Sequence, residues 1–165
     1  MIAVIGCGNA NRRDDGAGLA VIRRLYAREA LRANERVHLL DAGTDGMAVM
    51  FAARGCTSLI IVDACRTGVE PGAIFEVPGY ELQSRSNHSL NLHDFRWDHA
   101  LYAGRQIYRE NFPKDVIAYL IEAHDLEFGC ELSNNVQASA TRVADMIEVR
   151  ILATLRAEMP IASET

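Results

Sequence analysis

Acidic side chains that closely follow short apolar segments are the residues of this chain most able to do chemistry. Asp14 and Asp15 lie in the loop after the apolar run 2–5, and Asp63 immediately follows the apolar run 58–62. A third acidic turn, with the sequence DAGTDG at 41–46, follows another apolar stretch. Because like charges that gather in one place need a counterion, this repetition favours a bound cation.

A histidine could complete such a cation site. Carboxylate oxygens with one imidazole suit a divalent ion such as Ni, Zn, Mn or Fe, with positions left open for a partner's ligands. The available histidines are His88, His93 and His99, in or beside the polar segment 80–91. Any single histidine is more often structural, and a strand-end aspartate often only caps a turn. Both interpretations stay open on the residues alone.

The glycine-rich opening turn, GCGN at 6–9, invites comparison with a dinucleotide-binding loop. That fingerprint requires a third glycine where Asn11 stands, and Asp14 and Asp15 would repel a pyrophosphate at the helix start. The sequence also has no P-loop, no GxSxG elbow and no HExxH motif. Nucleotide binding is therefore disfavoured.

The four cysteines form no CxxC pair and no zinc-type spacing, so they are most simply free thiols. Cys7 and Cys65 lie beside predicted strand ends, which makes a nucleophilic thiol an alternative. No histidine is tied to either residue by local sequence, and small buried cysteines are common. We therefore give the thiols no catalytic role.

The order of apolar patterns predicts an α/β fold, a three-layer αβα sandwich with a mostly parallel, twisted sheet of about five strands. Ligands of such sheets collect outside the carboxyl ends of the strands, where the acidic residues stand. We predict a single domain over 1–158 and a frayed tail over 159–165. The predicted strands are 2–5, 36–40, 58–62, 73–77 and 116–121, and the predicted helices are 16–33, 47–55, 92–110 and 134–156, with a polar loop at 80–91.

Charge and composition narrow the class of partner. The formal net charge is -5 and no Lys/Arg-rich run is present, which argues against nucleic acid. The sequence shows no signal segment and no apolar stretch long enough to span a bilayer, so we expect no membrane partner. A cytoplasmic protein is expected.

Six segments taken together resemble the maturation endopeptidases of nickel-iron hydrogenases. The family's motifs are similar, in the same order and over nearly the whole chain, to GCGN at 6–9 with DDGAG at 14–18, DAGTDG at 41–46, IIVDA at 60–64, EPGA at 70–73, SLNLHDF at 89–95 and GCELSNNV at 129–136. The resemblance implies an αβα sandwich and an enzyme. Its reaction would be removal of the C-terminal extension of a hydrogenase large-subunit precursor after nickel insertion.

The resemblance also assigns roles to individual residues. Carried over position by position, it makes Asp15, Asp63 and His93 the catalytic residues and the ligands of nickel. The nickel is supplied by the precursor and serves as the recognition element, with Cd or Zn as a surrogate in crystals. The precursor is thus the expected protein partner. The residues expected to bind the substrate are Asn9, Asp14, Gly43 and Thr44.

Three departures from the family pattern concern the substrate rather than the ligands. Ala42 replaces a glycine, Asn134 replaces a proline, and the polar segment 11–13 replaces an apolar part of the first loop expected to touch the precursor. His88 is the rival of His93 for the histidine role. Two alternatives remain: a nickel-dependent chaperone that inspects the large subunit without cutting it, and a self-contained metallohydrolase.

Overall fold

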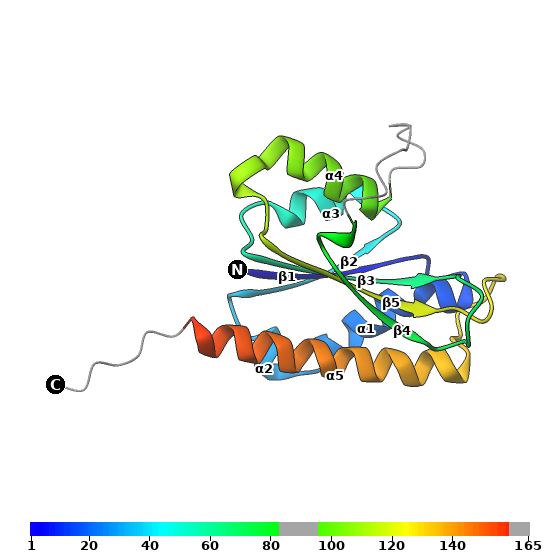
Figure 1. The fold of residues 1–165 in the computed structure, drawn as a ribbon. Coiled ribbons are helices and arrows are strands. Elements are labelled where there is room, and N and C mark those ends of the chain that lie inside the picture. The colour runs from blue at the N-terminus through cyan, green and yellow to red at the C-terminus, as the bar shows by residue number, and fades with distance from the viewer. Residues whose placement is uncertain (83–95, 159–165) are drawn as a thin grey trace.

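The computed structural model describes residues 1–82 and 96–158, which form a five-stranded sheet between two helical layers (Figure 1). The strands are β1 (Ile2–Cys7), β2 (Val37–Gly43), β3 (Ser58–Cys65), β4 (Ile74–Pro78) and β5 (Asp115–Glu122). The helices are α1 (Ala17–Tyr26), α2 (Glu29–Arg32), α3 (Gly46–Ala53), α4 (Trp97–Tyr108) and α5 (Asn134–Ala157), with 3-10 turns η1 (Arg13–Gly16) and η4 (Arg109–Asn111).

The strand order is β2-β1-β3-β5-β4, and only the edge strand β4 runs antiparallel to its neighbour. The four parallel strands therefore have their carboxyl ends at one edge of the sheet. Asp15 follows β1 there, and Asp63 lies in the last part of the adjacent strand β3, which extends to Cys65 and so past its predicted end. The predicted α/β class and mostly parallel sheet are confirmed.

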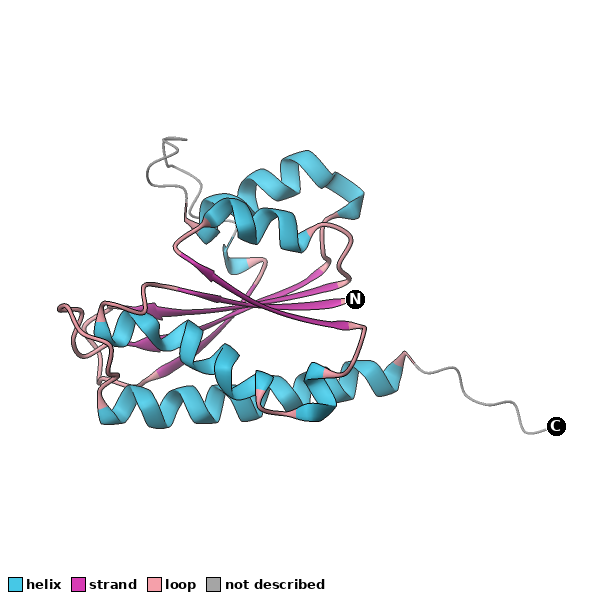
Figure 2. Ribbon diagram, turned by 180° about the vertical axis from the view of Figure 1, so that it is seen from behind, coloured by secondary structure: helices cyan, strands magenta, loops and turns pink. Residues whose placement is uncertain are grey.

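Both faces of the sheet are apolar, because both are covered by helices. Along β1, Ile2 and Val4 belong to the core that packs against α1, α2 and α5, while Ala3 and Ile5 belong to the core under α3 and α4. Figure 2 shows the two helical layers on opposite sides of the strands. A strand buried on both faces reads as a continuous apolar run, which explains the pattern at 2–5 and 58–62.

The first helix lies unusually close to the sheet because it carries glycine at its contact point. A Cβ atom added at Gly18 would lie 2.3 Å from the carbonyl oxygen of Cys7 and 2.5 Å from that of Val62. Gly6 meets the same helix, since its Cβ would lie 2.5 Å from the Gly18 carbonyl oxygen. This close approach fixes where the loop carrying Asp15 enters α1.

The predicted continuous helix over 16–33 is wrong. The chain forms η1, then α1, and then the short α2, because Arg28 takes an extended backbone conformation between the two α-helices. The guanidinium of Arg28 contacts α5, where it donates to the Ala144 carbonyl oxygen at 3.0 Å and pairs with Asp145 and Glu148. A tertiary contact 116 residues away in sequence thus ends the helix, and local periodicity could not predict it.

Several predictions concern residues outside the described ranges. They are most of the loop 80–91, the start of the helix predicted at 92–110, and the tail 159–165. His88 and His93 are among these residues. Within 1–82 and 96–158, no helix is both long enough and apolar enough to cross a membrane.

Substitution of Gly18 tests the close helix-to-sheet contact. We expect Gly18→Ala to lower the free energy of unfolding by about 3 kcal/mol, because the new methyl group would overlap two backbone carbonyl oxygens. Gly55→Ala is the control: nothing lies within 4 Å of its added Cβ, so only its positive φ opposes the change, at about 1 kcal/mol. Urea unfolding of both variants measures the difference, and equal losses would contradict the contact.

Candidate functional site

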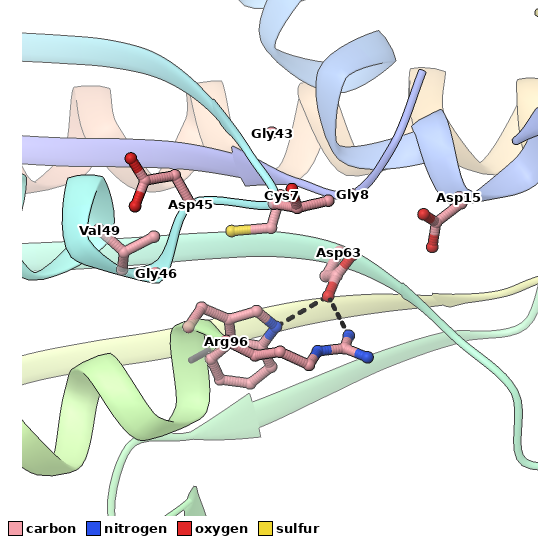
Figure 3. A pocket seen from close by; sticks show the side chains of 11 residues that line it. Cys7, Gly8, Asp15, Gly43, Asp45, Gly46, Val49, Asp63 and Arg96 are labelled. Atoms are coloured by element: carbon pink, nitrogen blue, oxygen red, sulfur yellow. Dashed lines mark hydrogen bonds and ion pairs between the residues drawn. The ribbon is translucent and has the colours of Figure 1, made fainter. Parts of the chain in front are cut away.

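A cavity of about 140 Å³ opens at the carboxyl ends of β1, β2 and β3. Asp15 lines it from η1 and Asp63 from the carboxyl-terminal part of β3, with Gly8 between them (Figure 3). A second cavity of about 360 Å³ lies beside the first and is lined by the same two aspartates. The structure therefore brings together the two acidic residues that the sequence placed after different strands.

Asp63 is a buried carboxylate, only 2% exposed. Its Oδ1 accepts from the backbone N–H of Ala64 at 2.8 Å, and its Oδ2 accepts from Trp97 Nε1 at 2.8 Å and from Arg96 Nη2 at 3.1 Å (Figure 3). Burial raises the pKa of Asp63, and these donors offset only part of that rise. The negative charge of Asp15 raises the pKa further, which places the two carboxylates within electrostatic reach of each other.

Asp15 is only partly buried, and among the described residues its carboxylate accepts from one backbone donor. The N–H of Asn9 donates to Asp15 Oδ2 at 2.8 Å across the first loop. Gly8, with φ +113°, makes this arrangement possible, because a Cβ there would lie 1.9 Å from the Asp15 carbonyl oxygen and 3.3 Å from Asp63 Oδ1. The glycine of the opening turn thus keeps the gap between the two aspartates open.

Asp14, the neighbour of Asp15, has a different environment. It is 0% exposed, and its carboxylate accepts from the N–H groups of His124, Asp125 and Ser133 and from the Ser133 hydroxyl, at 2.7 to 3.0 Å. Burial alone raises the pKa of Asp14, but these four donors outweigh it, so the pKa lies below its usual value. Asp14 joins the first loop to the connection between β5 and α5. Its predicted role in binding substrate stays a prediction.

The first loop and the β5–α5 connection are paired through their backbones as well. Arg13 donates its N–H to the Gly129 carbonyl oxygen at 2.8 Å, and Gly129 donates to the Asn11 carbonyl oxygen at 2.9 Å. The guanidinium of Arg12 lies over the ring of Phe128, 5.7 Å from its centroid, and this ring is 83% exposed. We call Arg12 and Phe128 the loop platform. It lies on the same two loops that carry Asp15 and the cavity-lining Leu126.

Glu122 holds the loop that follows Asp63. Its buried carboxylate accepts from the N–H groups of Thr67 and Gly68 at 2.8 Å and from the Thr67 hydroxyl at 2.9 Å. These donors outweigh burial, so the pKa of Glu122 lies below its usual value. A charged buried group with several donors fixes its loop firmly, which keeps the end of β3 in place.

The two thiols near the site are poorly suited to nucleophilic attack. Burial, followed by the charge of Asp63, raises the pKa of Cys7, which is 5% exposed. Burial and the contact with Glu122 raise the pKa of Cys65 to about 12. Because the thiolate is the reactive form, both cysteines are disfavoured as nucleophiles.

The residues predicted to bind substrate fall into different positions. Gly43 and Thr44 line the cavity on the β2 side, and Thr44 is exposed. Asn9 contributes its backbone N–H to Asp15, while its side-chain oxygen accepts from the N–H of Asn11 at 2.9 Å. Asp45 caps α3 by accepting from the N–H groups of Met47 and Ala48. Only Gly43 and Thr44 therefore face the cavity directly.

The chemistry of the aspartates fits a divalent cation in part. Two carboxylates in electrostatic contact supply hard oxygen ligands. Among the described residues, however, no group of three or more His, Cys, Asp or Glu side chains could hold a metal ion. His93 and its rival His88 lie outside these residues, so the three-ligand set Asp15, Asp63 and His93 stays a prediction.

Arg96 and Trp97 are site residues that sequence reasoning missed. Both donate to Asp63, and Trp97 also lines both cavities. The available signal was their position directly after the histidine-bearing segment 89–95, at the start of a predicted helix. Their partner is more than 30 residues away in sequence, so only the fold reveals the contact.

Comparison with known proteins assigns the chain to a family. A family model described as hydrogenase maturation protease (HycI) matches residues 19–150, which is most of the chain. The chain belongs to the hydrogenase maturation protease family. The resemblance drawn from the six sequence segments is therefore confirmed.

Relatives and solved structures from this family match most of the chain. HupD of Thiocapsa roseopersicina, a hydrogenase expression/formation protein, is 25% identical over 88% of this chain and 65% of its own length. The chain thus spans less than two thirds of that relative. HupM of Azotobacter chroococcum is 27% identical over 94% of this chain and 76% of its own length. HybD of Escherichia coli has a TM-score of 0.74 at 25% identity, covering 94% of this chain and 92% of that one.

Adjacent aspartates with different environments should respond differently to substitution. We expect Asp14→Asn to lower the free energy of unfolding by about 3 kcal/mol at pH 7, because an amide cannot accept from all four donors. The difference in the free energy of unfolding between wild type and Asp14→Asn should be largest above about pH 4. It should shrink as the pH falls through the pKa of Asp14 in the folded protein, which lies below its usual value. Urea unfolding between pH 3 and 7 measures this difference.

Asp15→Asn is the matched control for this experiment. Its amide oxygen can still accept from the Asn9 N–H, so a change of only about 0.5 kcal/mol is expected. A loss as large as that of Asp14→Asn, or a loss that does not depend on pH, would contradict the structural role of Asp14.

Proposed function

We propose that this protein is an endopeptidase that removes the C-terminal extension of a nickel-iron hydrogenase large-subunit precursor after nickel insertion. One observation carries the proposal: Asp15 from η1 and Asp63 from β3 line one cavity in a member of the hydrogenase maturation protease family. HybD of Escherichia coli is described as a hydrogenase maturating endopeptidase. We extend that activity to this chain.

In this proposal the nickel belongs to the substrate. The nickel ion that the precursor already holds is coordinated by Asp15, Asp63 and His93. Two carboxylates and one imidazole leave coordination positions open on the ion for the precursor's own ligands. The bound ion supplies Lewis acidity, which polarises the scissile carbonyl group or lowers the pKa of a water molecule. The metal thereby marks the precursor that is ready for cleavage.

The remaining residues of the cavity orient these groups. The Asn9 N–H holds the carboxylate of Asp15, and the Trp97 indole holds that of Asp63. Gly43 and Thr44 line the cavity beside the edge strand β2, where an extended peptide can pair with backbone groups. The scissile segment is proposed to lie across this side.

The loop platform is the proposed contact for the body of the precursor. Phe128 is 83% exposed and is covered on one side by the Arg12 guanidinium, which also donates through Nε to the Leu126 carbonyl oxygen at 3.0 Å. Exposed aromatic and arginine side chains on a fixed backbone are typical of binding hot spots. Its Arg12 belongs to the segment 11–13 of the first loop, where the chain departs from the apolar sequence of the family.

The proposed compartment is the cytoplasm. All four cysteines are free, which suits a reducing environment. The proposed macromolecular partner is the large-subunit precursor, and the net charge of -5 argues against a nucleic acid.

Cleavage of nickel-loaded precursor tests the proposed activity. We expect wild-type protein to shorten the large subunit at its C-terminus, as measured by mass spectrometry, and Asp63→Asn and His93→Ala to be slower by about 100-fold or more. His38→Ala is the control, because His38 is exposed near the amino-terminal end of β2, away from the cavity. Unimpaired cleavage by Asp63→Asn would contradict the proposed role of Asp63 as a ligand of the nickel ion. Nickel-dependent binding by wild type without any shortened product would favour the chaperone.

The loop platform makes a separate prediction. We expect Phe128→Ala to raise KM for the precursor about tenfold, with little change in kcat, because an exposed anchor contributes to binding rather than to chemistry. Stability should be unchanged, since the ring is mostly exposed. Phe51→Ala, at a phenylalanine of α3 that is 62% exposed, is the matched control. Equal KM values for the two variants would rule out the platform.

A further inference from the structure

The carboxylate of Asp63 is already paired with a cation of its own chain. Arg96 donates through Nη2 to Oδ2 at 3.1 Å, and the two side chains differ sharply in exposure, 67% for Arg96 and 3% for Asp63. No other ion pair of Asp63 is found within residues 1–82 and 96–158. A positive charge thus stands at the mouth of the site and neutralises a buried negative one.

The oxygen atoms of Asp63 leave little room for a second cation while Arg96 stays in place. Oδ2 accepts from both Trp97 and Arg96, and Oδ1 accepts from Ala64 and lies close to Gly8. Trp97 is a neutral donor that can remain when a metal ion binds. Arg96 opposes the metal ion, because two cations would then share one carboxylate and repel each other.

The free-energy cost of displacing Arg96 weighs differently on a free metal ion and on a metal ion that a docked protein holds. A free hydrated ion must lose water molecules and displace the charge-assisted hydrogen bond of Arg96 before it can bind the Asp63 carboxylate. An ion held by a docked protein arrives at a high effective concentration, which offsets that cost. The mostly exposed guanidinium is readily rehydrated when it leaves, so the exchange is reversible.

We propose that Arg96 is a specificity-determining residue: it occupies Asp63 as a counter-cation, so that the site refuses free divalent ions and takes a metal ion only from a protein that presents it. This inference rests on the proposed function and deepens it. It gives the exposed guanidinium of Arg96 a function, which is to keep free cations away from the buried carboxylate of Asp63.

A purely structural role for Arg96 is the competing explanation. The residue immediately precedes α4, and its side chain makes no capping hydrogen bond to that helix. Within residues 1–82 and 96–158, its guanidinium makes its polar contact with Asp63. Removing the guanidinium should therefore change metal affinity more than stability, and the two effects can be measured separately.

The chain contains a built-in reporter for the experiment. Trp97 is its single tryptophan, and the indole N–H donates to the same Asp63 oxygen as Arg96. Fluorescence of the purified full chain therefore reports directly on the surroundings of Asp63. We would titrate with CdCl₂ by fluorescence and with NiCl₂ by isothermal titration calorimetry, with no precursor present.

We expect Arg96→Gln to bind either free ion about 10- to 100-fold more tightly than wild type, which corresponds to loss of one charge-assisted bond. Arg96→Lys, which keeps the charge, should stay near wild type. Arg66→Gln is the matched control: Arg66 is an exposed arginine that lines the larger cavity with Arg96, but no ion pair joins it to Asp63. The double variant Arg96→Gln/Asp63→Asn should lose the gain.

Three results would overturn the proposal: wild type binding free ions as tightly as Arg96→Gln, an equal gain in Arg66→Gln, or a gain that survives loss of Asp63. Urea unfolding of each variant, with Arg96→Ala as a second replacement, separates affinity from folding. Because these titrations need no precursor, they decide the role of Arg96 even if wild type fails to cleave. A failed cleavage assay in turn removes only the proposed function.

Discussion

The burial of one carboxylate, that of Asp63, is the constraint on which the site depends. A carboxylate removed from water must be compensated by hydrogen bonds or an opposite charge. The chain meets this requirement with the backbone N–H of Ala64, the Trp97 indole and the Arg96 guanidinium. The start of α4 is therefore tied to the end of β3, across more than 30 residues of sequence. A cation is favoured at this position, whether it is supplied by the chain or by a partner.

The neighbouring aspartates show how environment divides one residue type into different roles. Asp14 is enclosed by four donors and joins two loops, whereas Asp15 has one donor and faces the cavity. The difference follows from the sharp turn at Gly8 and from the close contact of α1 with the sheet at Gly18. The turn η1 directs the carboxylate of Asp14 inward and that of Asp15 toward the cavity.

The surface around the site combines features that suit a protein client. The cavity lies beside an edge strand, and the loop platform presents an exposed aromatic ring on backbone that is hydrogen-bonded to a second loop. Arg12 of the platform lies in the segment 11–13, which departs from the apolar pattern of the family.

The sequence by itself determined the fold class, the strand positions and the two aspartates at the carboxyl ends of β1 and β3, because alternation of apolar runs and strand-end turns is local information. Its six motif segments also indicated the hydrogenase maturation protease family. Only the tertiary structure decided that Asp14 is enclosed while Asp15 is not, that Arg28 ends the first helix against α5, and that Arg96 and Trp97 hold Asp63. Each of these outcomes depends on a hydrogen bond or ion pair between residues far apart in sequence, and such contacts leave no periodic pattern along the chain.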